Sequence, residues 1–504
     1  MPGGGFCRTQ GSGSGQACQQ AGQAEKEKRP REETRQAGNK PRRCENMNRL
    51  TLLDSMFLGL ESPEIPAHVA GLQIYELPRG KGSAWLHGLM AELRQRPPGS
   101  PFNEKLHCRL GGLPELVVDE DYDPEYHLRH TVLPRPGTDE QLRSVLARLQ
   151  AHLIDRDRPL WEFHLIEGLE NRRFAFYIKI HHAICDGATF SKWMSQATTR
   201  SAASKDMRPI WQRPRMRASR TPRTGLEALQ APVNMLATAR DLGLGLGQLG
   251  GKLLQRRFLQ GDRSIALPLS SPSTALSAPP TASRNLAFTH FPLADLKAMG
   301  KPSGATLNDV VLALCDAALR RFLAEQGQVP EQPLVALVPV NLRQPGSEEE
   351  GNLVTSIQVK LGDRDQGHAE RLAAVRDAMR SGKALYTEIP TVASQAYSLG
   401  AAGLGAIGTA LHLEGIMPPP CNLIISNVPG PRETRYFGGA RLLETYPISG
   451  IAPMSALNVT VYSYDGELFF GLVAGRRALP HLHDLKLCID EVYDEFHEQL
   501  LGAD

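Results

Sequence analysis

The chain has 504 residues, of which 41% are hydrophobic and 22% charged, a globular composition with room for two or three domains. Residues 1–46 carry nine Lys and Arg against five Glu, a net charge of +4, so the remainder is near −1 and offers no basic domain for nucleic acid. The eight cysteines show no paired spacing and no run of about 18 apolar residues appears, which predicts a cytoplasmic protein without disulfides or membrane spans.

The first 46 residues differ from everything that follows. They are rich in Gly, Ser and Gln and then in Lys, Arg and Glu, and they have almost no large apolar side chains. Such a segment cannot bury enough apolar surface to fold. Because a globular pattern begins abruptly at Met47, we expect residues 1–46 to be a non-native upstream extension or a disordered tail.

Residues 47–203 alternate helical and strand patterns and are predicted to form an N-terminal domain. Apolar residues at helical spacing indicate a helix over 142–154, and a second, shorter helix is expected over 188–197. Between them, Phe174, Phe176, Ile178 and Ile180 alternate along one face of a predicted strand over 173–180.

Residues 204–284 are predicted to be a linker with a helical segment, because basic and Pro-rich sequence at 205–223 precedes a Leu- and Gly-rich stretch over 225–258. Residues 285–504 return to a mixed pattern and form a predicted C-terminal domain. Its expected elements are strands at 286–291, 334–340 and 423–425, a helix over 306–326, a hairpin formed by 457–464 and 468–473, and a helix over 483–501. Thr306 and Asp309 resemble a capping box at the start of the helix over 306–326. The fold class is therefore α/β (α+β) with two mixed halves.

The sequence His181-His182-Ala-Ile-Cys-Asp186-Gly187 follows the predicted strand at 173–180. If the alternation continues, His182 shares the apolar face and His181 points the other way. We expect Gly187 to adopt a positive φ and so permit a sharp turn into the next helix. Asp186 precedes that helix, where its carboxylate can cap the helix or pair with a buried arginine.

Histidine titrates near neutral pH, so His182 is predicted to act as a general base that accepts a proton from a hydroxyl. Structural roles are the alternative, because a single histidine on an apolar strand is usually a packed core residue. A metal site is not expected here, since adjacent strand residues face opposite ways and cannot chelate one ion. Cys185 is interpreted as a packing residue, and Gly245–Gly250, which matches GxGxxG, lacks the strand that a dinucleotide site requires.

These residues match the HHxxxDG signature of the CoA-dependent acyltransferase superfamily, and further segments resemble the bacterial wax ester synthase/diacylglycerol acyltransferase family. The resemblance runs in order from Met47 to about Leu501, and only the 46-residue front departs from it. The segments are Leu53-Asp54, Glu61-Ser62, Pro66, His68-Val69, Asp123–His130, Asp157–Glu162, Asn308-Asp309, Pro339–Arg343, Gly351-Asn352 and Ser426–Pro431.

The resemblance implies two chloramphenicol-acetyltransferase-like subdomains with a tunnel at their interface and His182 near its middle. It implies transfer of a long-chain acyl group from acyl-CoA, a cosubstrate rather than a resident cofactor, to a fatty alcohol or diacylglycerol. His181, Asp186, Gly187, Asn308 and Asp309 would support the site, with Asn308 a candidate to stabilise the oxyanion and the Ser426–Pro431 run shaping the tunnel.

Two other functions remain open from the sequence. Another HHxxxDG enzyme would acylate an amine or a carrier-linked acceptor, although no carrier domain is visible. A non-catalytic lipid-binding protein would be expected to lack His182 or Gly187, and both are present. The Leu-rich segments at 225–258 and 397–417 are interpreted as packed helices, and the alternative is that they, with the basic stretch at 205–223, contact a membrane or a lipid inclusion peripherally.

Overall fold

The structure is a computed structural model that describes residues 48–108, 113–204, 206–212, 247, 250–262, 264–267, 269–341, 354–387, 400, 403–413 and 416–502. The chain divides into two units, residues 1–46 and 47–504, and the fold described is that of the second unit. The predictions for residues 1–46 and for the linker residues 213–246 lie outside the described residues.

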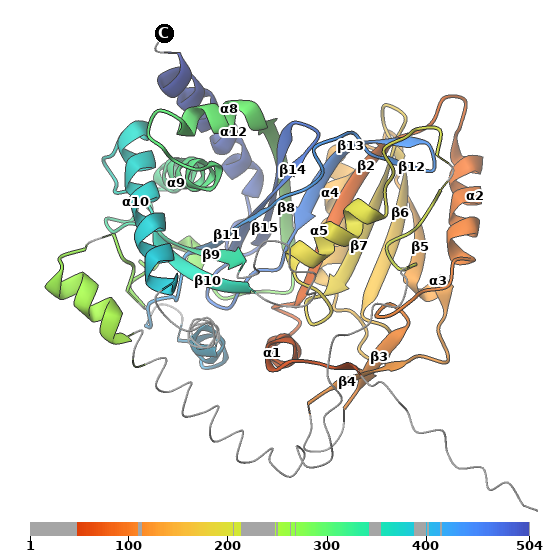
Figure 1. Cartoon of the computed structure of the whole chain (residues 1–504), viewed down its shortest axis with the longest axis horizontal. Coiled ribbons are helices and arrows are strands. Elements are labelled where there is room, and N and C mark those ends of the chain that lie inside the picture. The colour runs from red at the N-terminus through yellow and green to blue at the C-terminus, as the bar shows by residue number, and fades with distance from the viewer. Residues whose placement is uncertain are drawn as a thin grey trace, which may run out of the picture. The chain divides into compact units, whose positions relative to one another are not determined.

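The first of two six-stranded sheets has the strand order β12-β13-β2-β7-β6-β5. Four of its strands come from the N-terminal half and two from the C-terminal half, so the sheet is not contiguous in sequence (Figure 1). Strand β13 pairs antiparallel along β2, from Ile448 opposite Ala70 to Arg441 opposite Glu76. The strands are β2 (His68–Glu76), β5 (Leu128–Val132), β6 (Trp161–Leu169), β7 (Arg173–His181), β12 (Tyr436–Phe437) and β13 (Ala440–Ile448).

Strand β7 is the centre of this sheet, and almost all of its side chains are buried. The predicted apolar face, Phe174 to Ile180, packs in the hydrophobic core. On the opposite face, Lys179 donates to the carbonyls of Leu149 and His152 at 3.2 and 3.1 Å, at the end of α4 (Asp139–Ala151). A cation is favourable at a helix C-terminus, and Glu162 lies 3.3 Å from the same ammonium group.

The second sheet has the order β10-β9-β11-β14-β15-β8, and all of its described strands come from the C-terminal half. Strand β11 runs parallel to β9 and β14, while the other neighbours are antiparallel. Strand β13 of the first sheet packs against β14 and β15 and so joins the two sheets. The strands are β8 (Arg284–Pro292), β9 (Val335–Asn341), β10 (Val354–Lys360), β11 (Leu423–Val428), β14 (Leu457–Tyr464) and β15 (Glu467–Gly475).

Helices α8, α10 and α12 pack around α9, beside the second sheet (Figure 1). Most side chains of α9 are buried in one core, which explains its nearly continuous apolar sequence. The N-terminal half adds shorter helices and a three-stranded sheet of order β1-β4-β3. The N-terminal elements are α1 (Leu52–Leu60), α2 (Ser83–Arg94), α3 (Pro124–His127), α5 (Gly187–Gln196), β1 (Asn48–Arg49), β3 (Glu104–His107) and β4 (Glu115–Val118). The helices that follow are η1 (Gln255–Leu259), η2 (Ala275–Ser277), α8 (Leu293–Gly300), α9 (Leu307–Glu325), α10 (His368–Thr387) and α12 (Leu482–Leu501).

Most predicted elements that fall in described residues are present. Thr306 and Asp309 form the expected capping box of α9, and the hairpin turns at Asp465 and Gly466, both with positive φ. The expected pair of α/β halves is confirmed, but the predicted boundary near residue 285 does not separate the sheets, because β12 and β13 complete the N-terminal one. Within the described ranges, none of the helices has the length and apolarity needed to cross a bilayer.

Candidate active site

A cavity of about 400 Å³ lies between the two large sheets, within the size range of small-molecule sites. The first sheet contributes the ends of β2 and β13, the second contributes β9, β10, β11 and β14, and α1 and α5 complete the wall. Most of the lining is apolar. Its polar side chains include His182, Asp186, Ser191, Ser426, Asn427, Ser449, Asn458, Thr460 and Tyr462.

His182 lies directly after β7 and lines this cavity. Its backbone N–H donates to the carbonyl of Ala67 at 2.8 Å, which extends the pairing of β7 with β2 by one residue. The imidazole stacks on the ring of Phe57 from α1, with 4.1 Å between ring centroids and 15° between ring planes. Backbone pairing and stacking therefore hold a titratable ring at the wall of a mainly apolar cavity.

His181 has different neighbours and is fully buried. Its Nδ1 accepts the backbone N–H of Ala183 at 3.0 Å, so in the neutral ring the proton resides on Nε2. That Nε2 lies 3.4 Å from a carboxylate oxygen of Glu61, directly after α1. His181 thus links α1 to the turn that carries His182.

Glu61 is the central acceptor of this link. Its carboxylate also accepts the backbone N–H of Ala67 at 3.0 Å and two N–H groups of Arg156 at 3.0 and 2.8 Å. Burial alone would raise the pKa of Glu61, but His181, Ala67 and Arg156 together outweigh burial and lower it to about 2. The carboxylate is therefore ionised at neutral pH and connects Ala67, Arg156 and the turn that carries His182.

Asp186 caps α5, as predicted, and its side chain is almost completely buried. One carboxylate oxygen accepts the backbone N–H of Thr189 at 2.7 Å. The capped helix then places Phe190, Ser191 and Met194 along the cavity. The expected ion pair of Asp186 with an arginine remains a prediction.

Replacing Asp186 with alanine should lower the free energy of unfolding by about 1–2 kcal/mol, because the first turn of α5 loses its cap. Activity should fall in parallel, because the residues of α5 that line the cavity become less well ordered. Asp186→Asn keeps an acceptor oxygen and should therefore retain much of the stability and the activity that Asp186→Ala loses. Thermal unfolding and ester formation measured on the same preparations would show the parallel. Lost activity at an unchanged melting temperature would instead give Asp186 a direct chemical role.

The prediction that Gly187 has a positive φ is wrong. Gly187 is the first residue of α5, and it is absent from the described glycines with positive φ. The chain turns between His182 and Asp186 instead. A Cβ atom at position 187 would meet only Val428, at 3.6 Å, so steric crowding does not require the glycine. Since Gly187 lines the cavity, the absence of a side chain leaves space there.

Three residues of the Ser426–Pro431 run, Ser426, Asn427 and Val428, line the cavity, and the tunnel that this run was expected to shape remains a prediction. The hydroxyl of Ser191 donates to the carbonyl of Pro429 at 2.8 Å and so ties α5 to this run. Gly430 is required by close packing, since a Cβ there would lie 2.3 Å from the carbonyl oxygen of Ser463.

Asn308 and Asp309 are not brought to the cavity. Asp309 belongs to the capping box of α9, and the amide of Asn308 lies 3.9 Å from the sulfur of Met379. Neither is among the described residues that line the cavity around His182. The structure therefore gives no support to Asn308 as the oxyanion donor, since a capping motif positions these residues instead.

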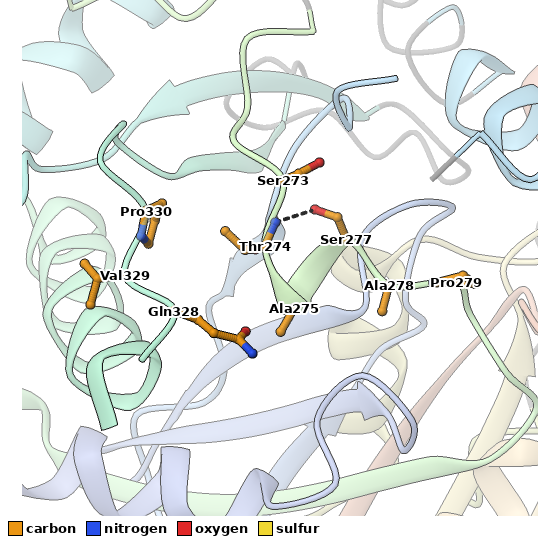
Figure 2. Close-up of a pocket in the computed structure, with 9 residues that line it drawn as sticks. All are labelled: Ser273, Thr274, Ala275, Ser277, Ala278, Pro279, Gln328, Val329 and Pro330. Atoms are coloured by element: carbon orange, nitrogen blue, oxygen red, sulfur yellow. Dashed lines mark hydrogen bonds between the residues drawn. The ribbon is translucent and has the colours of Figure 1, made fainter. Parts of the chain in front are cut away.

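A second hollow, of about 550 Å³, lies between η2 and the segment Gln328–Pro330 (Figure 2). Its lining consists of small, apolar and uncharged polar residues, and a hydrogen bond from the backbone of Thr274 to Ser277 closes the η2 turn at 3.5 Å. No described residue of that lining titrates near neutral pH, so this hollow offers no acid–base chemistry. The cavity at His182 remains the candidate active site.

Sequence reasoning did not assign roles to Phe57 or Glu61. Glu61 contributed to the family resemblance, but nothing in its sequence neighbourhood indicates a contact with a histidine 120 positions later. Nor did any local pattern indicate that residues 445–447 of β13 would form part of the wall. Such contacts depend on long-range pairing.

Comparison with known proteins agrees with this geometry. Residues 50–311 match the wax ester synthase/diacylglycerol acyltransferase catalytic domain, and residues 350–497 match the C-terminal domain of the same enzymes. The chain is 36% identical to a probable diacylglycerol O-acyltransferase of Mycobacterium tuberculosis H37Rv over 89% of this chain and 98% of the relative.

Two solved structures extend the comparison. The wax ester synthase/diacylglycerol acyltransferase from Marinobacter aquaeolei VT8 is 32% identical, with a TM-score of 0.68 over 89% of this chain and 98% of that one. The first condensation domain of the calcium-dependent antibiotic synthetase is 17% identical, with a TM-score of 0.55 over 91% of this chain and 97% of that one, and shows the fold alone.

The fold and the site define a two-subdomain acyltransferase of the HHxxxDG type. Within that class, the chain belongs to the wax ester synthase/diacylglycerol acyltransferase family, and it is an O-acyltransferase.

Proposed function

We propose that the enzyme transfers a long-chain acyl group from acyl-CoA to a fatty alcohol, to diacylglycerol, or to both, with His182 as the general base. The observation that carries the proposal is the position of His182, at the wall of a mainly apolar cavity formed by both sheets. An apolar cavity suits hydrocarbon chains, and a histidine can exchange protons near neutral pH.

The proposed reaction proceeds through a ternary complex. Nε2 of His182 accepts the proton of the acceptor hydroxyl as the oxygen attacks the thioester carbonyl of acyl-CoA. The resulting tetrahedral oxyanion collapses, the carbon–sulfur bond breaks, and the CoA thiolate takes the proton from His182. The ester and free CoA leave, and His182 returns to its neutral form. Acyl-CoA is a cosubstrate in this scheme, which requires no resident cofactor.

Initial rates with radiolabelled palmitoyl-CoA and hexadecanol, or with a diacylglycerol as the acceptor, test this scheme. Direct transfer requires both substrates to be bound together, so double-reciprocal lines should intersect, and no acylated protein should appear in mass spectra after incubation with acyl-CoA alone. An alkyl amine of the same chain length is the matched acceptor control and should react far more slowly.

A covalent mechanism would give the opposite pattern. Parallel lines, release of CoA without acceptor, and a thioester mapped to Cys185 would together replace the general-base scheme with a cysteine–histidine pair. The complete burial of the Cys185 side chain supports its interpretation as a packing residue.

We also propose that this enzyme works in the cytoplasm and contacts membranes or lipid inclusions peripherally. The five described cysteines are free thiols, which suits a reducing compartment. Phe258 and Leu259 are 67% and 82% exposed next to Arg256 and Arg257, a combination that favours an anionic lipid surface. Leu411 and Ile416, 63% and 80% exposed, provide further apolar surface.

Sedimentation with anionic phosphatidylglycerol vesicles should show binding that weakens with salt. The double variant Phe258→Ser/Leu259→Ser should bind several-fold less, while its rate with detergent-dispersed hexadecanol stays unchanged. Leu487→Ser is the matched control, because Leu487 is an exposed leucine on α12 outside this segment. Equal vesicle binding by the double variant and the control would remove Phe258 and Leu259 from the proposed contact.

A further inference from the structure

Two histidines and a glutamate converge on the N-terminal half, outside the cavity. His87 comes from α2, His130 from β5 and Glu167 from β6. Nε2 of His130 lies 3.2 Å and Nε2 of His87 3.9 Å from the same oxygen of Glu167. One ligand atom from each residue lies within 4.8 Å of the others.

The local structure fixes this convergence. Strands β5 and β6 are parallel neighbours with Val132 opposite Glu167, so His130 is a diagonal neighbour of Glu167 on the same sheet face. Ser83 and His87 are four positions apart on α2 and lie on one face of that helix. The Ser83 hydroxyl donates to the Glu167 carboxylate at 3.1 Å and holds it towards α2.

The charge balance of the cluster is unusual. The Glu167 side chain is only 10% exposed, yet no lysine or arginine in the described part of the chain forms an ion pair with it. Its neighbours are two imidazoles, and Nε2 of His130 is buried without a hydrogen-bond partner among the described residues. A buried carboxylate normally has a cationic partner or binds a metal.

We propose that His87, His130 and Glu167 bind one divalent transition-metal ion, with Zn²⁺ as the best fit. Two imidazole nitrogens and a carboxylate oxygen form a common zinc ligand set, and bonds of about 2.0–2.1 Å place tetrahedral ligands roughly 3.3 Å apart. The separation of 3.2 Å between His130 and Glu167 is close to that value, whereas the 3.9 Å between His87 and Glu167 has to shorten by about 0.6 Å. The His87 side chain is 62% exposed, so it can adjust, and water can reach a fourth position.

The proposed ion is structural rather than catalytic. None of its three ligands is among the described residues that line the cavity at His182. The ion would cross-link α2 to the paired strands β5 and β6. Metal binding should therefore stabilise the fold and leave acyl transfer unchanged.

The test uses tag-free full-length protein stripped with a chelator and titrated with ZnCl₂ against a chromophoric zinc chelator. We expect one equivalent of Zn²⁺ to bind and the melting temperature to rise. His87→Ala and Glu167→Gln should each weaken zinc binding at least about tenfold. Loss of a residue that only supports a ligand already weakens binding about tenfold or more, and loss of a ligand itself should weaken it at least as much. His107→Ala, which removes an exposed histidine from β3, should bind like the wild type.

The exposed position of His87 keeps the test interpretable, because its replacement should not disturb folding. Substitution with Co²⁺ should give the visible absorption bands of a tetrahedral site in the wild type and lose them in His87→Ala. Failure of the wild type to bind Zn²⁺ saturably would overturn the proposal, and so would equal zinc affinity in the wild type and His87→Ala. Unchanged ester formation in His87→Ala would keep this result separate from the function of His182.

Discussion

Replacement of His182 by alanine should lower the rate of ester formation by about 10²–10⁴-fold, the usual contribution of general acid–base catalysis. The cavity would lose the histidine that we propose as its base. The fold should survive, because the backbone N–H of His182, rather than its ring, pairs with Ala67. Initial rates with saturating acyl-CoA and alcohol would measure the loss, and circular dichroism would confirm folding.

His483→Ala is the matched control, since His483 is exposed in α12 and lies outside the cavity lining. It should retain the wild-type rate. If the folded His182→Ala enzyme kept more than about a tenth of the wild-type rate, another group would have to be the base.

Replacement of Glu61 by glutamine should destabilise the protein by up to about 3 kcal/mol at pH 7. The pKa of Glu61 is lowered from 4.5 to about 2, and each pH unit by which it is lowered corresponds to about 1.36 kcal/mol of stability. Glutamine cannot match the charge that faces Arg156 and His181. Activity should also fall, because the turn that carries His182 loses its anchor to α1. Urea unfolding would measure the change in stability.

The effect should depend on pH with a definite sign. The pKa of Glu61 is lower in the folded protein than in the unfolded chain, so its contribution is complete above about pH 4.5 and is lost as pH falls towards 2. The difference between wild type and Glu61→Gln should therefore shrink by about half or more at pH 3. Glu120→Gln, at an exposed carboxylate, is the control and should show little difference at any pH. A Glu61→Gln deficit that stays constant down to pH 3 would show that the carboxylate charge is not its source.

Local signals in the sequence predicted much of the site. The alternation of apolar side chains from Phe174 to Ile180 predicted β7 and the placement of His182 at its end, because a period-two sequence pattern is a property of a few adjacent residues. Asp186 was predicted as a cap from its place before a helical pattern, and the Thr306–Asp309 capping box was predicted in the same way. These features need only neighbours within one turn or one strand.

The remaining features depend on residues distant in sequence. The stacking of Phe57 on His182, the contact of Glu61 with His181, and the cluster of His87, His130 and Glu167 each join separate elements. The incorrect prediction of a positive φ for Gly187 has another cause. A glycine after an aspartate is compatible with either a left-handed turn or the first residue of a capped helix, and only the surrounding structure selects between them.

The pairing of β13 with β2 has a consequence for folding during translation, because the two strands are synthesised far apart in time. Strand β2 is complete at residue 76, but its partner ends at residue 448, so 372 residues must be added before that edge is covered. At about 5–20 residues per second, translation leaves the edge open for roughly 20–75 s. An open strand edge invites pairing with other chains. The open edge of β2 therefore exposes the N-terminal half to aggregation while most of the chain is being synthesised. The cavity around His182 can close only near the end of translation.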